Sequence, residues 1–254
     1  MRVKDLLTSS LLMVTLILGC SKSDKDDTVV TPVHWDYENT DWQEEGYSEC
    51  AGKAESPIDI NTSQTIKGQL PAITFNYQDM PLQVLDNGHT IQVLGDGKNS
   101  IVLNGKTFVL KQLHFHHLSE HKIDGKAQAM EIHFVNQHDA SGEIVVLAVF
   151  LTPGKQNTIL DKVFNNFPTT KDTPKLVANV TLNPADLLPK NRSYYNYTGS
   201  LTTPPCTQGL DWIVYKNAVE FSSDQETTFS KLYPKNSRPT QDLANRIVLE
   251  QDEL

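Results

Sequence analysis

Histidines with the spacing of metal ligands are the first chemical feature of the sequence. Five of the eight histidines lie between positions 114 and 133. Successive side chains of an extended strand point to opposite faces, so His114 and His116 share one face, and His133 shares a face with Glu131 on a second stretch. If the two stretches pair, three imidazole nitrogens meet at one point. Three neutral imidazoles suit Zn²⁺ and leave a fourth position for water, as in catalytic rather than structural zinc sites.

The spacing alone leaves two interpretations of these histidines open. A His-x-His pair also occurs on many solvated strands, where it binds nothing. The third histidine, one hairpin away, favours a zinc site, and Glu131 would hold the second ring nitrogen of a ligand. Three other histidines are interpreted as ordinary polar residues: His34, His117 and His138.

Short strands are expected to position these residues, because alternating or wholly apolar stretches recur with turn residues between them. The stretch 144–151 is apolar on both faces, which indicates a central strand. The close spacing of turns favours antiparallel strands over βαβ units. The predicted fold class is α+β, mostly β, with a large central twisted sheet, predominantly antiparallel, and small peripheral helices. The predicted strands cover residues 73–77, 90–94, 100–103, 107–110, 113–117, 129–136 and 144–151.

Two short helices are predicted after the strand at 144–151. Residues 158–167 place four apolar side chains on one stripe, which is typical of a helix packed against a core. A capping box formed by Ser223 and Glu226 is expected to begin the second helix, which continues through position 232.

The composition indicates one domain with a packed core. The chain has 254 residues, of which 38% are hydrophobic and 21% charged. The sequence after Trp35 contains no linker of the Gly/Ser-rich or Pro-rich kind, so residues 34–254 are predicted to form a single domain. The net charge of −9 argues against nucleic acid as a partner, since phosphate binding requires a basic surface.

The N-terminus predicts export from the cytoplasm. Residues 1–19 have the layout of a signal peptide, with a basic start and an apolar run too short to span a bilayer. Gly19-Cys20 resembles a bacterial lipobox, so Cys20 is predicted to carry lipid, and residues 20–33 to form a flexible tether. The expected location is the periplasm or cell surface of a bacterial envelope. The alternative is a soluble periplasmic or secreted protein with an ordinary signal peptide.

Two cysteines remain if Cys20 carries lipid. In an exported domain, Cys50 and Cys206 suggest one disulfide that closes a long loop. Two separate buried thiols are the alternative. The C-terminal Gln-Asp-Glu-Leu254 is a weak signal for retention in a eukaryotic secretory pathway, since it lacks the usual Lys or His, and the bacterial interpretation is preferred.

Several motifs resemble those of the α-class carbonic anhydrases, and the resemblance extends over nearly the whole chain after the predicted leader. They occur in the family's order and at its approximate spacing. The motifs are Trp35-x-Tyr37, Ser56-Pro-Ile-Asp-Ile60, Asn87-Gly-His89-Thr90, His114-Phe-His116-His-Leu-Ser-Glu120-His121, Glu131-x-His133, Gly199-Ser-Leu-Thr202-Thr203-Pro-Pro-Cys206 and Asn236-Ser-Arg-Pro239.

The resemblance implies an enzyme, a lyase that hydrates carbon dioxide reversibly to bicarbonate and a proton. By position, His114, His116 and His133 match the ligands of one zinc ion per chain. Thr202 and Glu120 match the pair that orients the zinc-bound hydroxide for its attack on carbon dioxide. An ionised Glu can only accept a hydrogen bond, so it directs the Thr proton and leaves the Thr oxygen as an acceptor.

The resemblance also assigns roles around this centre. His89 matches the proton shuttle, and an unperturbed pKa of about 6.5 suits that task. Cys50 and Cys206 match the family's single disulfide. The other matches are Tyr37 and Asn87 on the water path, Gln112, His121 and Glu131 beside the ligands, and Val135, Val146, Leu201, Thr203 and Trp212 in the substrate pocket.

Two other function classes fit the sequence less well than a carbonic anhydrase. A catalytically silent binding module on the same fold typically lacks one or more ligand histidines, and this sequence has all three. A protein that stores or carries metal favours a closed site or a His-rich tract, and the sequence shows neither. An esterase side activity is compatible with an activated hydroxide. The expected partners are the small-molecule substrate and the membrane through the lipid anchor, and a homodimer is left open.

Overall fold

A computed structural model describes residues 34–253 of the protein. The predicted signal peptide, the predicted tether and Cys20 lie outside the described residues. Between positions 34 and 253, no helix is long and apolar enough to cross a membrane.

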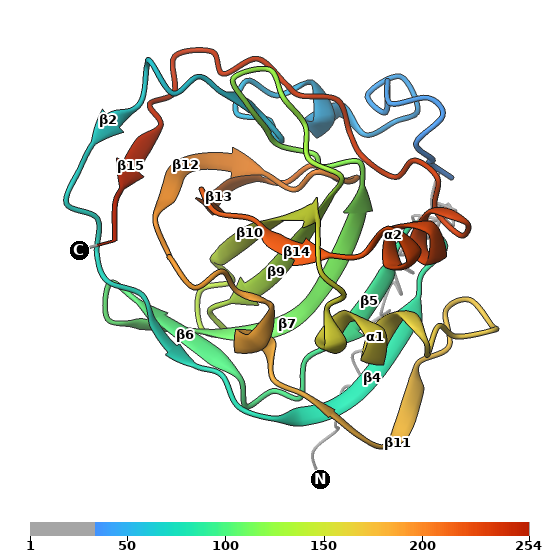
Figure 1. Ribbon diagram of the computed structural model, residues 1–254. Helices are drawn as coiled ribbons and strands as arrows, with labels where there is room; N and C mark the ends of the chain where they lie inside the picture. The colour runs from blue at the N-terminus through green and yellow to red at the C-terminus, as the bar shows by residue number, and fades with distance from the viewer. Residues whose placement is uncertain (1–33, 254) are drawn as a thin grey trace, which may run out of the picture. The chain divides into compact units, whose positions relative to one another are not determined.

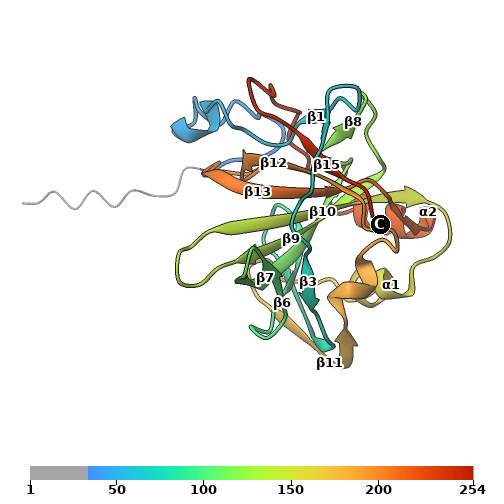
Figure 2. The ribbon, with the colours of Figure 1, turned by 90° about the vertical axis from the view of Figure 1, so that its left-hand side faces the viewer.

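One large twisted sheet, with thirteen strands in the described part of the chain, forms the frame of the molecule (Figures 1 and 2). Its strands are β2 (Ile66–Lys67), β3 (Thr74–Asn76), β4 (Met80–Asp86), β5 (Ile91–Leu94), β6 (Ser100–Leu103), β7 (Lys106–His117), β9 (Met130–Gln137), β10 (Ile144–Pro153), β11 (Lys175–Leu182), β12 (Tyr194–Ser200), β13 (Gln208–Tyr215), β14 (Val219–Phe221) and β15 (Leu249–Gln251). The remaining small elements are the strand pair β1 (Asp59–Ile60) and β8 (Lys122–Ile123) and the 3₁₀ turns η1 (Ser48–Ala51) and η2 (Pro184–Leu187).

The strands of the large sheet run in the order β11-β4-β5-β7-β9-β10-β13-β12-β15-β2, with β3, β6 and β14 attached beside this path. Within the range 34–253, nine of its twelve strand pairings are antiparallel, so the predicted fold class is confirmed. The sequence did not anticipate that β10 and β13, in the middle of the sheet, pair in parallel. The two stretches predicted as separate strands at 107–110 and 113–117 form one strand, β7.

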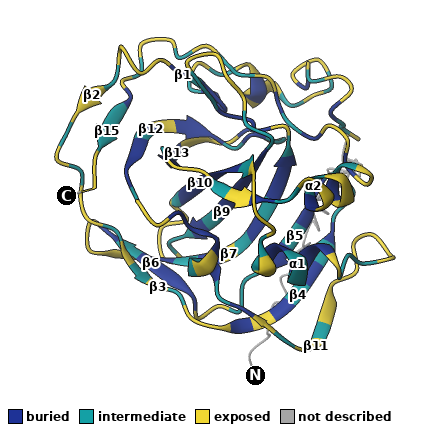
Figure 3. Ribbon diagram, in the orientation of Figure 1, coloured by how far each residue is buried: buried dark blue, intermediate teal, exposed yellow. Residues whose placement is uncertain are grey.

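The central strand β10 separates two apolar cores, as its continuous apolar run predicted. Alternate side chains from Val145 to Leu151 belong to one buried cluster, and Val146, Ala148 and Phe150 belong to the other. All residues from Val145 to Leu151 are buried, and the central strands are mostly dark blue in Figure 3. A strand buried on both sides cannot shift its register by one residue without exchanging its two sets of side chains, so the centre of the sheet is a rigid support.

Two short helices cover one side of the sheet (Figure 1). Helix α1 (Thr158–Phe164) begins at the N-cap Asn157 and ends three residues before the predicted end at 167. Phe164 of α1 and Phe229 of α2 (Ser223–Ser230) both contact Phe115 of β7, at ring-centroid distances of 5.3 and 6.0 Å. Phe115 points away from the face that carries His114, so the helices leave that face of β7 uncovered.

The predicted capping box of α2 is wrong by one residue. Ser222 is the N-cap, and its hydroxyl accepts from the Gln225 N–H while Gln225 Oε1 accepts from the Ser222 N–H. The physical reason lies in Gln225, whose Nε2 also donates to Asn157 O and to Asp161 Oδ1. Gln225 thereby ties the two helix starts together, a link that Glu226 could not make as an acceptor-only side chain.

Candidate active site

Three histidine side chains converge on the uncovered face of the sheet. Strand β7 pairs antiparallel with β9, and the register sets His114 opposite His133 and His116 opposite Glu131. One ring nitrogen from each of the three histidines lies within 4.8 Å of those of the other two. Side chains two residues apart on one strand point to the same face, and paired strands lie side by side. The three rings therefore come together on one face of the sheet. This group can hold a metal ion.

Hydrogen bonds orient two of the rings by their Nδ1 atoms. His114 Nδ1 lies 2.9 Å from Gln112 Oε1, and His116 Nδ1 lies 2.7 Å from the carbonyl oxygen of Asn236. Because both partners are acceptors, each Nδ1 carries the proton and each Nε2 is left with a free lone pair. His116 Nε2 is buried and has no hydrogen-bond partner among the described residues.

The third ring is oriented the other way. His133 Nε2 lies 2.7 Å from Glu131 Oε1, so its Nδ1 keeps the free lone pair. Burial acts to raise the pKa of Glu131, but the nearby His121 and His133 outweigh it and hold that pKa well below the usual value. Glu131 is therefore a permanent acceptor, and it also receives the Nδ1 proton of His121 at 2.6 Å. His121 is fixed at its other nitrogen by the Tyr197 hydroxyl, 2.7 Å away.

Burial keeps His114 and His116 neutral. Together with the neighbouring histidines, it lowers the pKa of His114 well below the usual value and that of His116 to about 3. A metal ligand must be the unprotonated imidazole, so no proton has to be displaced from these rings near neutral pH. The donor set, its fixed tautomers and the unpartnered buried nitrogen all fit a cation such as Zn²⁺.

Glu120 lies beside two of the rings, with Oε1 3.4 Å from His116 Nδ1 and Oε2 3.8 Å from His133 Nδ1. Its side chain is buried, and its Oε1 accepts from the backbone N–H of Arg238 at 2.9 Å. Burial raises the pKa of Glu120 to about 7, while His133, the Arg238 N–H and the Thr202 hydroxyl each act to lower it. Thr202 thus acts on this carboxyl group, although Glu120 Oε2 makes no hydrogen bond of ordinary geometry within residues 34–253.

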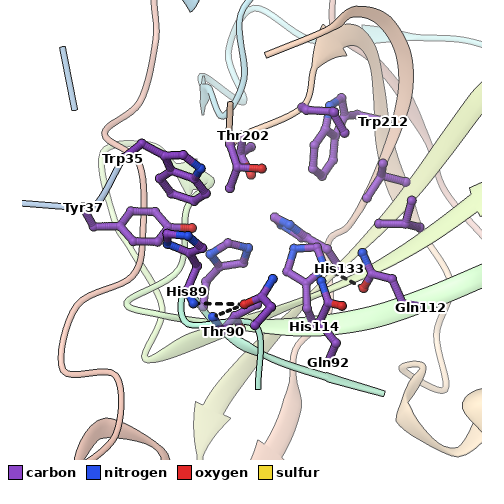
Figure 4. Close-up of a pocket in the computed structure, with 16 residues that line it drawn as sticks. Trp35, Tyr37, His89, Thr90, Gln92, Gln112, His114, His133, Thr202 and Trp212 are labelled. Carbon is purple, nitrogen blue, oxygen red and sulfur yellow. Dashed lines mark hydrogen bonds between the residues drawn. The ribbon is translucent and has the colours of Figure 1, made fainter. Parts of the chain in front are cut away.

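A cavity of about 210 Å³ opens above the three histidines (Figure 4). Val135, Val146, Leu201 and Trp212 form its apolar side, and Thr202 and Thr203 lie beside them. Glu120, His121 and Glu131 support the lining residues from behind and do not line the cavity themselves. The other lining residues are Trp35, Tyr37, Asn87, His89, Thr90, Gln92, Gln112, His114, His116 and His133.

His89 stands at the rim of this cavity, opposite the apolar side (Figure 4). Asn87 Oδ1 accepts from the N–H groups of His89 and Thr90 and so holds the turn that carries the imidazole. The His89 ring stacks on Trp35, with centroids 3.7 Å apart and planes 8° apart. Burial, helped by His34 and Lys171, lowers the pKa of His89 below its usual value. The ring is therefore neutral near neutral pH and can accept a proton.

Cys50 and Cys206 form a disulfide, with Cα atoms 5.0 Å apart. The alternative of two separate buried thiols is therefore wrong. The bond lies three residues after Thr203, whose carbonyl oxygen accepts from the Cys206 N–H at 2.9 Å. It ties the N-terminal segment to the loop that carries Thr202.

Comparison with known proteins identifies the family. Residues 37–252 match the family described as eukaryotic-type carbonic anhydrase. The chain belongs to the α-carbonic anhydrase family. A carbonic anhydrase of Neisseria gonorrhoeae is 41% identical over 226 residues, covering 85% of this chain and 88% of the relative, and one of Pectobacterium carotovorum is 36% identical over 246 residues, covering 94% and 96%.

Solved structures agree with the sequence comparison. The α-carbonic anhydrase of Thermovibrio ammonificans, solved in complex with the inhibitor sulfanilamide, superposes with a TM-score of 0.82 at 40% identity over 86% of this chain and all of that one. The Photobacterium profundum α-carbonic anhydrase gives a TM-score of 0.79 at 38% identity over 85% and 100%. The present enzyme is a carbonic anhydrase, and the family's general activity is carbon dioxide hydration.

Sequence reasoning missed several residues that shape this carbonic anhydrase site. Asn236 and Arg238 were noted only as part of a motif, yet their backbone groups bind His116 and Glu120. A backbone donor or acceptor carries no signal in the side-chain pattern, so only the fold could reveal them. Trp35 was likewise noted in a motif without a role, and its stacking on His89 depends on two loops that meet in space.

Proposed function

We propose that this carbonic anhydrase holds one zinc ion with His114, His116 and His133 and hydrates carbon dioxide in the cavity above them. The observation that carries the proposal is the convergence of three ring nitrogens, each on an imidazole whose other nitrogen is held by an acceptor. The chemistry that zinc supplies when bound, well established for carbonic anhydrases, is a lowered pKa of water, so that hydroxide is available near neutral pH.

Thr202 and Glu120 direct the attack. A carboxylate can only accept hydrogen bonds, so the Thr202 hydroxyl donates to Glu120 and presents its oxygen lone pair to the cavity. Thr202 would then accept a hydrogen bond from the attacking hydroxide and so direct a lone pair of the hydroxide toward the substrate carbon. The effect of the Thr202 hydroxyl on the Glu120 pKa supports this pairing, and the positive charge of a bound metal would favour the ionised carboxylate further.

The apolar side of the cavity receives the substrate. Carbon dioxide carries no charge and forms weak hydrogen bonds, so it gains from contact with Val135, Val146, Leu201 and Trp212 rather than from polar groups. Bicarbonate is charged and loses hydration against the same surface, which favours its release. The cavity thus distinguishes substrate from product by polarity.

His89 moves the proton that each hydration leaves behind. The imidazole lines the same cavity as the zinc ligands, is neutral near neutral pH, and is therefore able to accept a proton through water. Tyr37 and Asn87 line the cavity on the same side and border the water path. Stacking on Trp35 holds the ring at the rim, where a diffusible buffer can take the proton onward.

Metal analysis combined with an activity assay tests the zinc centre. Carbon dioxide hydration by the purified enzyme should be abolished by a zinc chelator and restored by zinc. His116→Ala should lose most of the bound zinc, whereas the control His138→Ala, outside the cavity, should retain one zinc per chain. Full zinc and full activity in His116→Ala would contradict the proposal.

We further propose that the enzyme is exported and anchored by lipid on Cys20. The signal-peptide layout supports export, and the Cys50–Cys206 disulfide suits an oxidising compartment such as the bacterial periplasm. The alternative is a soluble periplasmic or secreted form, and the sequence leaves a homodimer open.

A further inference from the structure

A buried ion pair outside the cavity joins Glu55 to Arg238. Glu55 Oε2 accepts from Arg238 Nη1 at 2.7 Å, and the two side chains are only 3% and 2% exposed. The same guanidinium donates to the carbonyl oxygens of Ser56 at 2.7 Å and Cys50 at 3.0 Å. It also lies 5.2 Å from the ring centroid of Trp42. Arg238 is thus held from several directions at once.

Stability alone is a weak explanation for this pair. Burying two charges is costly, and buried pairs can often be replaced by apolar groups without loss of stability. Here two atoms of the pair, Glu55 Oε1 and Arg238 Nε, are buried without a hydrogen-bond partner in the described part of the chain. A pair built for stability would satisfy these atoms.

One side of the pair leads to Glu120. The backbone N–H of Arg238 donates to Glu120 Oε1 at 2.9 Å. The direction of that N–H depends on where the Arg238 backbone lies, and the anchored guanidinium limits how far the backbone can move. Glu55 therefore acts on Glu120 through Arg238.

The other side of the pair leads to Thr202. The Ser200 hydroxyl has two acceptors for its proton, the same Glu55 Oε2 at 3.2 Å and the Leu201 carbonyl oxygen at 2.8 Å, and its Oγ accepts from the Ser56 N–H at 2.9 Å. The Ser200 N–H donates in return to Ser56 Oγ at 3.1 Å, and the Ser200 carbonyl accepts from Trp212 Nε1 at 3.0 Å. Ser200 is two residues before Thr202 on the same segment, so its anchorage sets the position of the Thr202 hydroxyl.

We propose that Glu55 is a positioning residue for carbon dioxide hydration. Its Oε2 atom is shared by Arg238 and Ser200, and through them it sets the separation of Glu120 and Thr202, which belong to different segments of the chain. The inference rests on the roles proposed above for Thr202 and Glu120. Glu55 contacts no reacting atom, and its effect passes only through that pair.

A double-mutant cycle on the zinc-loaded full chain tests this role. Glu55→Gln keeps the size of the side chain but removes its negative charge, so the hydrogen bonds that Oε2 accepts from Arg238 and Ser200 lose the strength that the charge gives them. It should lower kcat/KM for carbon dioxide roughly tenfold, as the loss of a supporting contact around a metal site typically does. Thr202→Ala alone should lower kcat/KM about a hundredfold. In the Thr202→Ala background, Glu55→Gln should change kcat/KM less than twofold, because nothing is left for it to position.

Two further variants make the comparison specific. Glu250→Gln removes the ion pair that Glu250 forms with Lys216 at 2.9 Å and should leave kcat/KM unchanged. Because Glu55→Gln leaves the Arg238 charge buried without a counterion, it could impair folding. Ser200→Ala breaks the link to Thr202 while the ion pair stays intact, and it should show the same non-additivity with Thr202→Ala.

Each result has one meaning. Glu55→Gln is the variant that decides, and Ser200→Ala replaces it if Glu55→Gln does not fold. If that variant lowers kcat/KM by the same factor with Thr202 present and with Thr202→Ala, the role of Glu55 is merely structural and the inference is overturned. If Thr202→Ala alone leaves kcat/KM unchanged, the proposed role of Thr202 is wrong and the positioning role of Glu55 falls with it. Loss of the Glu55→Gln effect in the Thr202→Ala background supports the inference.

Discussion

Replacing both Cys50 and Cys206 by serine should lower the free energy of unfolding by up to about 5 kcal/mol. The disulfide joins residues 156 positions apart. In the chain-entropy account, closing a loop of that length removes roughly 17 cal/mol/K from the unfolded chain, which corresponds to about 5 kcal/mol at 25 °C. Native disulfides typically contribute about 2–5 kcal/mol when measured, so the calculated value is an upper limit.

Thermal unfolding followed by circular dichroism measures this effect. For a domain of this size each kcal/mol corresponds to roughly 2–4 °C in Tm, so the full effect lowers Tm by about 10–20 °C. The double serine variant and its disulfide-containing reference should both carry Cys20→Ser, which removes the third thiol. Both should also be saturated with zinc, since bound metal stabilises the native state by mass action. A Tm shift of less than about 2 °C would refute the assumption that the bond acts by restricting the unfolded chain.

Three other predictions concern proton transfer, acid stability and anchoring. His89→Ala should lower kcat but leave kcat/KM for carbon dioxide nearly unchanged, and imidazole at high concentration should restore part of kcat; parallel loss of both parameters without rescue would mean that His89 only shapes its turn. In the metal-free protein the pKa of His116 is about 3, against about 6.5 when unfolded, so the unfolded chain binds the proton first and the unfolding free energy falls as pH drops from about 6.5 toward 3, by up to about 1.4 kcal/mol per pH unit. Urea unfolding at several pH values should therefore give a steeper dependence for the wild type than for His116→Asn, and equal slopes would contradict the burial argument. Cys20→Ser should release the enzyme from the membrane fraction with unchanged kcat/KM, and retention in that fraction would exclude a lipid anchor on Cys20.

The candidate metal ligands could be predicted from the sequence, but the residues that hold them in position could not. The alternation of side chains around His114 and His133 requires only that each stretch be extended, and extended strands have a fixed period. The prediction that the two strands pair was reasonable because they are neighbours in the chain. Asn236 and Arg238 act through backbone atoms more than 115 residues from their partners, His116 and Glu120. No local pattern specifies such contacts.

The fold shows the same division between local and distant information. The doubly buried strand β10 was predicted because a run of apolar residues needs no partner to be recognised. Its parallel pairing with β13 was not, since periodicity does not say which strand lies alongside. Strand β12, with the sequence Tyr-Tyr-Asn-Tyr-Thr-Gly-Ser, was missed because its polar and aromatic residues do not alternate cleanly. The capping box was misplaced because the contact of Gln225 with the other helix decides which serine serves as the N-cap.

Because the chain is made from its N-terminus, the three candidate metal ligands are available before the residue that orients one of them. All three candidate ligands are present once residue 133 has been made, and two adjacent strands are enough to bring them together. The acceptor that orients His116 is made later, with Asn236, which lies 120 residues after His116. A nascent or C-terminally truncated chain therefore has Gln112 and Glu131 to orient His114 and His133, but it lacks the acceptor that fixes the tautomer of His116, so its set of lone pairs is not yet defined for one metal. When the C-terminal segment packs against β7, Asn236 binds His116, and the three rings then present one defined set of lone pairs.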